Sequence, residues 1–331
     1  MGLNKAKIIG MGSYLPEKVL SNKDLEKIVE TTDEWIVTRT GMKERRIAGK
    51  NEYTSDMGAK AALKAIEDAK LSVGDIDCIL VATLTPDYTF PSTACLIQKK
   101  IGAGMVPALD IQAACSGYIY GLSIAKAFVE QNIYRNVLLV ASEKLSSIVN
   151  YKDRTTCVLF GDGAAASVIS SSPSGFSIES ISLGSDGFQA DLLQLPAGGS
   201  VHPASFETVA KEMHYISMNG KELFKHAVRR MEQASKACLE KANMKETDIS
   251  WLIPHQANER IIDAIAKRFQ HLLKEKVYKE VVRKYGNTSA SSVGIALDEL
   301  KKNQKICLNE TVLLTAFGAG LTWGGTILKS V

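Results

Sequence analysis

The chain of 331 residues alternates short apolar runs with longer segments whose apolar residues recur at helical spacing. Continuous apolar runs at 76–83, 137–141, 249–254 and 312–316 are typical of strands buried on both faces. Alanine-rich segments that end near Lys70 and Asn243 predict long amphipathic helices. Strands that alternate with amphipathic helices predict an α/β fold built from stacked layers.

The same pattern occurs twice along the chain. "IIGMGSYLP" from residue 8 resembles "SISLGSDGF" from residue 180, and "NVLLVA" from residue 136 resembles "TVLLTA" from residue 311. "AIEDAKLSVGDIDCILV" from residue 65 similarly matches "CLEKANMKETDISWLIP" from residue 238. Matches in the same order at nearly one offset indicate a duplicated fold. We predict two similar halves, 1–172 and 173–331, joined where Ser, Pro and Gly cluster at 171–175.

A cysteine stands where a strand is expected to turn into a helix. In "DIQAACSGY", residues 110–118, small residues surround Cys115, and apolar residues then recur at helical spacing. A helix N-terminus stabilises a thiolate, and thiolates attack carbonyl groups. An isolated buried cysteine is otherwise a small hydrophobic core residue. The setting therefore favours a nucleophile with a lowered thiol pKa.

The duplication suggests partners for this cysteine. An offset of 172 residues carries Cys115 onto Asn287, in "YGNTSASSVGIALDEL", where small residues again lead into a helix. In "WLIPHQANERIIDAIAKRF", residues 251–269, His255 is the first polar residue after an apolar strand, and a helix is expected to follow. Catalytic groups in α/β sheets gather at the carboxyl ends of strands. We predict that Cys115, His255 and Asn287 face one another.

Composition narrows the function classes. A net charge of +4 gives no support for nucleic-acid binding. Six scattered cysteines without a CxxC pair favour a reducing compartment and predict neither a disulfide framework nor a zinc site. No apolar run reaches membrane-spanning length, and no signal-peptide core is evident, so a cytoplasmic location is expected. Gly10-Met-Gly12 lacks the third glycine of a dinucleotide fingerprint.

Four segments, "AACSG", "PHQAN", "GNTSASS" and "FGAGLTWG", resemble the signatures of β-ketoacyl-acyl carrier protein synthase III, the initiating condensing enzyme of dissociated fatty acid synthesis. The resemblance extends over nearly the whole chain through "TTDEWIVTRTGMKERRIA", "FPSTACLIQ", "DRTTCVLFGDGAAA" and "MNGKELFKHAV". It implies the thiolase fold, a layered αβαβα duplication, and a homodimer. It also implies an acyltransferase that condenses acetyl-CoA with malonyl-acyl carrier protein and uses no metal or redox cofactor.

The resemblance also implies a role for individual residues. Cys115 becomes the nucleophile, His255 and Asn287 complete the triad, and the backbone N–H groups of Cys115 and Ala319 form the oxyanion hole. Phe90 limits the acyl pocket across a dimer interface. The residues expected to contact coenzyme A are Thr31, Trp35, Arg39, Arg154, Gly220 and Asn258. The residues expected to receive the acidic carrier protein are Lys225, Arg260, Lys267 and Arg268, the last three on one helix.

Two features depart from the family pattern. Ala319 stands where many members have glycine, and its N–H is usable only if the backbone there tolerates a Cβ. The segment 189–214 is longer than in shorter members and is expected to form a surface excursion. Alternative functions are a 3-hydroxy-3-methylglutaryl-coenzyme A synthase, a polyketide starter synthase or, from another class, a non-catalytic scaffold. The complete triad argues against the scaffold.

Overall fold

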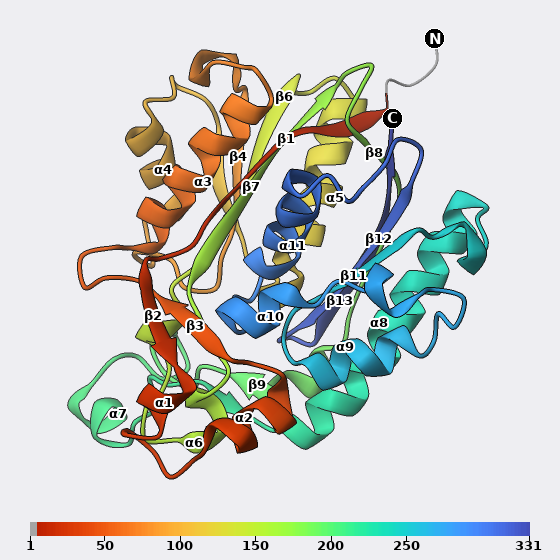
Figure 1. Ribbon diagram of the computed structural model, residues 1–331. Helices are drawn as coiled ribbons and strands as arrows, with labels where there is room; N and C mark the ends of the chain where they lie inside the picture. The colour runs from red at the N-terminus through yellow and green to blue at the C-terminus, as the bar shows by residue number, and fades with distance from the viewer. Residues whose placement is uncertain (1–4) are drawn as a thin grey trace.

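The computed structural model describes residues 5–331, and a nine-stranded sheet runs through it (Figure 1). In spatial order its strands are β11 (Trp251–Pro254), β12 (Thr311–Gly318), β13 (Thr322–Ser330), β8 (Phe176–Ser185), β1 (Ala6–Tyr14), β7 (Gly163–Ser171), β6 (Asn136–Glu143), β4 (Cys78–Ala82) and β5 (Ala108–Ile111). Two small sheets pair β2 (Lys18–Ser21) with β3 (Glu44–Ile47) and β9 (Leu193–Gln194) with β10 (Ser217–Met218).

The large sheet has the same strand order on either side of its centre. Outward from β1 come β7, β6 and β4, and outward from β8 come β13, β12 and β11. The β4–β6 and β11–β12 pairs are parallel, whereas the other pairs along both series are antiparallel. The predicted duplication of the fold is confirmed.

The chain passes from one half of the sheet to the other between Ser171 and Phe176. This is the predicted junction, although the division into domains 1–172 and 173–331 stays a prediction, and residues 1–4 lie outside the described part. β1 and β8 pair only at Lys7 and Ile8, so the two halves of the sheet diverge from there.

Helices fill three layers around the two halves of the sheet. α3 (Thr54–Asp68) and α4 (Thr93–Ile101) cover one outer face, and α8 (Gly220–Ala242) and α9 (Glu259–Ala266) cover the other. α5 (Gly117–Glu130) and α11 (Ser291–Lys302) lie between the halves, as Figure 1 shows. Each interface has its own apolar cluster. The predicted αβαβα layering is therefore confirmed.

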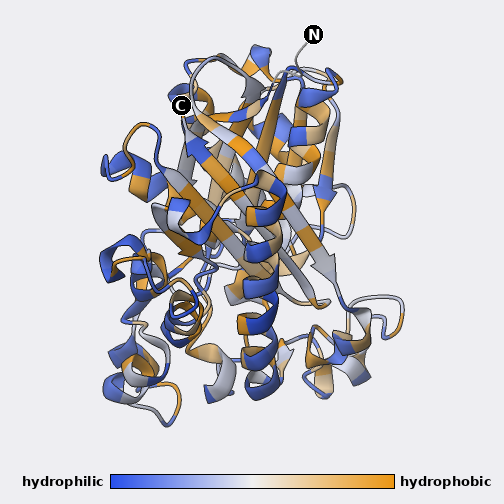
Figure 2. Ribbon diagram, turned by 90° about the vertical axis from the view of Figure 1, so that its right-hand side faces the viewer, coloured by the Kyte–Doolittle hydropathy of each residue, from blue (hydrophilic) through white to orange (hydrophobic). Residues whose placement is uncertain are grey.

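The predicted strands and helices form for the expected reasons. β4 and β12 are buried along their whole lengths, as continuous apolar runs require. Figure 2 looks onto the face that α8 covers, and hydrophilic residues follow the outer side of that helix. The predicted strand before Cys115 is β5, which lies at the sheet edge and is only partly buried.

The remaining helices are short. Near one end of the molecule lie α1 (Asn22–Leu25), α2 (Asp33–Thr40), α6 (Arg154–Cys157) and α7 (Phe206–Ala210), while α10 (Glu280–Tyr285) packs on β3 and α11 (Figure 1). Within residues 5–331, none of the helices combines the length and apolar character that a membrane crossing needs.

Candidate active site

Cys115 lies in a tight turn, Ala114–Ser116, between β5 and α5, as the sequence predicted. Ala114 adopts the left-handed region with φ of 44°, and β12 ends directly against the turn. A Cβ on Gly318 would stand 2.6 Å from the Cys115 nitrogen, so only glycine permits this approach. The Thr322 hydroxyl donates to the Ala113 carbonyl at 2.9 Å and ties β13 to the same turn.

His255 follows β11 directly. Its backbone N–H donates to the Thr315 carbonyl at 2.7 Å, which extends the pairing with β12 by one residue. The Nδ1 atom lies 2.7 Å from the Ser292 hydroxyl oxygen of α11. Gln256 is fully buried, and its side-chain amide donates to the carbonyls of Pro254 and Tyr278. These bonds fix the strand end that carries the imidazole.

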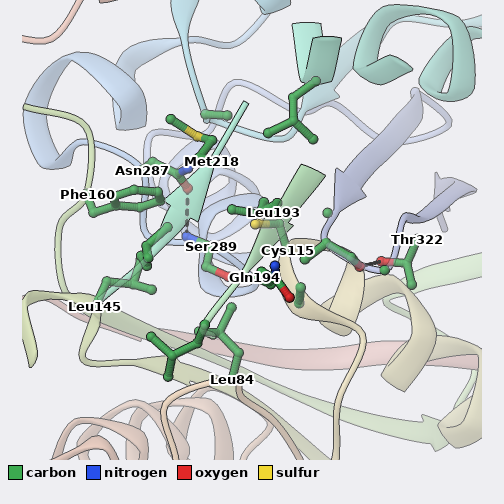
Figure 3. Close-up of a pocket in the computed structure, with 18 of the residues that line it drawn as sticks. Leu84, Cys115, Leu145, Phe160, Leu193, Gln194, Met218, Asn287, Ser289 and Thr322 are labelled. Atoms are coloured by element: carbon green, nitrogen blue, oxygen red, sulfur yellow. Dashed lines mark hydrogen bonds between the residues drawn. The ribbon is translucent and has the colours of Figure 1, made fainter. Parts of the chain in front are cut away.

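Asn287 is held by its backbone and by its own side chain. Its N–H donates to Leu159 at 2.8 Å, and its carbonyl accepts from Gly161 at 3.0 Å. Its Oδ1 atom accepts from the Ser289 N–H at 2.9 Å, drawn as a dashed line in Figure 3. The side-chain NH₂ group is therefore the part of the amide that is left to donate to a ligand.

The three side chains converge on one cavity. Cys115, His255 and Asn287 all line a space of about 800 Å³, which is mostly walled by apolar side chains. Figure 3 shows Cys115, Ser289 and Asn287 together along its wall. The predicted meeting of the three residues is thus confirmed, although their catalytic roles stay predictions. Ala319, the other proposed oxyanion residue, also lines the cavity, and its φ is not in the left-handed region.

Burial controls the ionisation of the central groups. Burial raises the pKa of the Cys115 thiol to about 12, and the nearby Ser289 hydroxyl offsets this only in part. This is opposite to our expectation of a lowered thiol pKa, because burial removes the water that would stabilise a thiolate. Burial likewise lowers the pKa of His255 to about 3, so its imidazole is neutral at physiological pH.

A carboxyl group that the sequence analysis missed lies behind the cysteine. Glu143, the last residue of β6, is fully buried and accepts from the backbone N–H of Thr85 and from its hydroxyl. Burial raises the pKa of Glu143 to about 7. The buried Ser289 hydroxyl makes no hydrogen bond of good geometry to residues 5–331, yet it lowers the pKa values of both Glu143 and Cys115.

The long segment 189–214 does more than form a surface excursion. α7 is exposed to solvent around Phe206, but Leu193, Gln194 and Leu195 line the cavity, together with Ala197, Gly198 and Gly199. Sequence reasoning missed this wall because the segment has no repeat counterpart and no motif.

The residues expected to contact coenzyme A fall into two groups. Gly220 and Asn258 line the cavity. Trp35 lies outside the cavity lining, with the guanidinium groups of Arg154 and Arg39 at 5.0 and 5.9 Å from its ring centroid. Thr31 precedes α2, close to Trp35 in the chain. The groups are joined where the Asn258 side chain donates to the Arg39 carbonyl at 3.2 Å.

Phe90 is 84% exposed and does not line the cavity of this single chain. Its neighbour Thr89 does. Phe90 therefore does not limit the acyl pocket of its own chain. Its expected role requires a second copy of this chain.

The expected docking helix is shorter than predicted. α9 ends at Ala266, because the backbone then closes into tighter turns in which the Arg268 N–H donates to the Ile265 carbonyl. Arg260, Lys267 and Arg268 therefore do not share one helix. Lys225, Lys267 and Arg268 nevertheless surround a second hollow between α8 and α9, whereas Arg260 does not line it.

Within residues 5–331, no group of three or more His, Cys, Asp or Glu side chains is arranged to hold a metal ion.

Comparisons with known proteins show the family to which the chain belongs. A family model described as 3-oxoacyl-[acyl-carrier-protein] synthase III matches residues 109–187, and the model of its C-terminal part matches residues 239–330. A β-ketoacyl-[acyl-carrier-protein] synthase III of Chlamydia caviae is 61% identical, with 99% of this chain and 98% of the relative covered.

Solved structures give the same picture. The 3-oxoacyl-[acyl-carrier-protein] synthase III of Aquifex aeolicus VF5 superposes with a TM-score of 0.89 at 49% identity, over 98% of this chain and 99% of that chain. The priming β-ketosynthase of the R1128 polyketide pathway superposes with a TM-score of 0.91 at 34% identity, over 99% and 96%.

The duplicated layers and the cysteine at the start of a central helix define a thiolase-like condensing enzyme, an acyltransferase. Within that class the chain belongs to the 3-oxoacyl-[acyl-carrier-protein] synthase III family, whose members initiate fatty acid synthesis.

Proposed function

We propose that the protein condenses acetyl-CoA, or another short acyl-CoA, with malonyl-acyl carrier protein and releases acetoacetyl-acyl carrier protein, CO₂ and CoA. The observation that carries this proposal is the convergence of Cys115, His255 and Asn287 on one largely apolar cavity. Family membership supports the substrates, because relatives bear the name β-ketoacyl-[acyl-carrier-protein] synthase III. The reaction proceeds in two half-reactions through an acyl-cysteine.

In the first half-reaction the Cys115 sulfur attacks the acyl carbonyl, the bond from that carbonyl to the CoA sulfur breaks, and the Cys115 S–H proton passes to the departing CoA sulfur, which leaves as a thiol. One thioester replaces another, so the exchange is nearly balanced in energy. The negative oxygen of the tetrahedral intermediate requires fixed donors, and we assign the N–H groups of Cys115 and Ala319. Ala319 serves because its backbone conformation is compatible with a Cβ.

In the second half-reaction the malonyl thioester loses CO₂ and becomes an enolate. The imidazole of His255 and the side-chain NH₂ of Asn287 donate to the enolate oxygen. The enolate carbon then attacks the acyl-Cys115 carbonyl, a carbon–carbon bond forms, and the Cys115 thiolate leaves and is reprotonated. Thioester exchange and decarboxylation require neither a metal nor a redox cofactor.

The surfaces around the cavity offer a place for each of the two substrates. Trp35, Arg39 and Arg154 provide an aromatic ring and two cations for the adenine and phosphates of CoA. Gly220 and Asn258 line the cavity, and we assign them to the pantetheine arm. The hollow around Lys225, Lys267 and Arg268 provides positive charge for an acidic carrier protein.

All six cysteines are free, and the cytoplasmic location stays a prediction.

We also infer a homodimer formed along the edge of the sheet. β5 is the last strand on its side. Large apolar side chains nearby are exposed, with Phe90 at 84%, Tyr88 at 62% and Leu109 at 41%. An unpaired edge strand with exposed apolar residues favours pairing with a second copy. The dimer would bring Phe90 of the partner subunit toward the cavity, beside Thr89.

The experiment that tests this function separates the two half-reactions. Acetyl-CoA should acetylate the wild-type protein at Cys115 alone, as seen by peptide mass spectrometry, and malonyl-acyl carrier protein should then yield acetoacetyl-acyl carrier protein. His255→Ala and Asn287→Ala should keep acyl transfer but lose decarboxylation by about a hundredfold or more, because each removes a donor.

Asn303→Ala, at an exposed position after α11, serves as the control. Normal decarboxylation by both variants would refute the assigned roles. Acetylation without any condensation product on the fatty acid carrier protein would favour the polyketide starter alternative, which shares the fold.

A further inference from the structure

Three buried polar groups meet behind the imidazole of His255. The Ser292 hydroxyl oxygen lies 2.7 Å from Nδ1 of His255 and 3.3 Å from the backbone nitrogen of Gln256. Ser292 and Gln256 are fully buried, and His255 is 3% exposed. Ser292 belongs to the first turn of α11, so a central helix holds this hydroxyl in place. The mechanism proposed above does not use it.

The hydrogen bonds of this cluster determine which ring nitrogen of His255 carries the proton. The Gln256 N–H can only donate, so the Ser292 oxygen accepts this bond. The hydroxyl has one proton of its own, and among residues 5–331 Nδ1 of His255 is the acceptor that lies within hydrogen-bond distance. If Nδ1 carried a proton, that proton would point at the same oxygen and leave the buried hydroxyl proton without an acceptor. An unsatisfied buried donor costs about 1–3 kcal/mol.

The other ring nitrogen has a different environment. Nε2 makes no hydrogen bond to any residue of the described part, 5–331, and His255 lines the cavity that also contains Cys115 and Asn287. A neutral imidazole carries its proton on one nitrogen and a lone pair on the other. The state of Nδ1 therefore decides whether the cavity meets a donor or a base.

We propose that Ser292 is a positioning residue which donates its hydroxyl proton to Nδ1 of His255 and thereby holds the proton of the imidazole on Nε2. His255 then presents a hydrogen-bond donor to the cavity, beside the NH₂ group of Asn287. It cannot accept the Cys115 proton in this form, because its lone pair is bonded to Ser292. The consequence for catalysis rests on the proposed function, whereas the tautomer follows from the hydrogen bonds alone.

Burial supports a fixed tautomer by keeping the ring neutral, since it lowers the pKa of His255 to about 3. A neutral Nε2–H group can stabilise the enolate oxygen without delivering a full proton to it. Early protonation of that oxygen would quench the nucleophilic carbon, so a donor is better suited to condensation than an acid.

The tautomer can be measured without substrate. In protein labelled with ¹⁵N-histidine, the His255 signals, assigned by their loss in His255→Ala, should show a protonated Nε2 and an unprotonated, hydrogen-bonded Nδ1. In Ser292→Ala the signals should move toward a mixture of both tautomers. A wild-type spectrum with the proton on Nδ1 would overturn the proposal.

Kinetics test the consequence. Ser292→Ala should lower condensation with malonyl-acyl carrier protein by the factor by which the Nε2-protonated fraction of His255 falls, about two- to tenfold, because only that fraction offers a donor to the cavity. Acetylation of Cys115 should not change measurably. Ser291→Ala is the matched control, since Ser291 is an equally buried neighbour whose hydroxyl donates to Thr288 instead. Ser292→Thr keeps the hydroxyl and should restore most of the condensation.

The outcomes separate this proposal from the proposed function. Equal losses in both half-reactions of Ser292→Ala, or no loss in either, would mean that Ser292 serves packing alone and would overturn it. If the wild-type protein failed to form acyl-Cys115 or to decarboxylate the malonyl thioester, the proposed function would fall. The nitrogen signals of His255 would still decide the tautomer.

Discussion

At the scale of single residues, the site combines a nucleophile and a donor that are both uncharged at rest. The cavity removes water from Cys115 and His255, and each side chain therefore favours its neutral form. A preformed thiolate–imidazolium pair, which is common in cysteine hydrolases, is not supported here. Neutral groups suit a site that must receive an apolar acyl chain and an enolate in turn.

This ionisation state predicts how Cys115 responds to pH. With a pKa raised to about 12, the thiolate fraction should grow about tenfold per pH unit between pH 7 and 9. Ionisation of Glu143, whose pKa is raised to about 7, adds a nearby negative charge and delays the rise further. The rate of iodoacetamide labelling at Cys115, followed by peptide mass spectrometry, should therefore show no plateau below pH 9.

Cys115→Ser identifies the labelled peptide in that experiment. A plateau reached below pH 7 would show instead that the helix N-terminus outweighs burial, as the sequence had suggested.

The sequence predicted Cys115, His255 and Asn287, because each combines a distinctive residue with the end of a strand or the start of a helix. It did not predict Ser292, Gln256 or Glu143. These side chains act through bonds to chain segments 22 to 60 residues away, and no local pattern marks them. A serine near a helix start or a glutamate at a strand end is common, and only the folded chain shows which partner it meets.

At the scale of elements, the position of the first strand depends on glycine. A Cβ on Gly12 would stand 2.5 Å from the Ala61 carbonyl oxygen and 2.6 Å from the Ala65 nitrogen of α3. Helix backbone cannot move aside as a side chain can. β1 and α3 are therefore packed at a distance that only glycine allows.

Gly12→Ala should accordingly lower the free energy of unfolding by about 1–3 kcal/mol through overpacking. The lower stability should appear as a lower thermal midpoint in circular dichroism. Gly187→Ala is the control, because no atom lies within 4 Å of a Cβ placed there. Equal midpoints for the two variants would contradict the close packing of β1 on α3.

The hollow between α8 and α9 gives a second prediction at this scale. Lys225→Glu combined with Lys267→Glu should raise the KM for malonyl-acyl carrier protein, and added salt should reduce the difference because it screens the encounter. Acetylation by acetyl-CoA should barely change. Lys50→Glu with Lys70→Glu makes the same charge change at exposed positions elsewhere. Equal losses in both half-reactions would argue against docking in this hollow.

The sequence predicted that Arg260, Lys267 and Arg268 would share one helix, since Ile262, Ile265 and Phe269 continue the apolar period. In the structure Phe269 remains buried while the helix ends at Ala266. An apolar side chain is thus buried beyond the last residue of the helix. Periodicity alone could not distinguish a buried residue of a helix from a buried residue that follows one.

At the scale of the whole molecule, the duplication explains why the site lies where it does. α5 and α11 are equivalent central helices, and the residues before them carry Cys115 and Asn287. The repeat offset revealed this relation in the sequence. It could not reveal the wall formed by 193–199, which belongs to one half only.

The dimer is the prediction that belongs to this scale. The wild-type protein should sediment at twice the mass of the chain, because β5 offers an open strand edge beside the exposed side chains of Met105 and Leu109. Met105→Glu with Leu109→Glu places charge along that edge and should give a monomer. The monomer should also lose selectivity for short acyl-CoA, since Phe90 of the partner subunit could no longer limit the cavity.

Leu273→Glu with Leu308→Glu is the matched control, because both leucines are exposed, at 63% and 70%, away from β5. This variant should sediment as a dimer and keep the wild-type preference. A wild-type monomer with full activity would contradict the dimer, and with it the role of Phe90. A monomeric edge variant that kept its preference for short acyl-CoA would leave the dimer intact but remove Phe90 from the acyl pocket, and the limit on chain length would then have to come from the chain's own wall at Leu193 and Leu195.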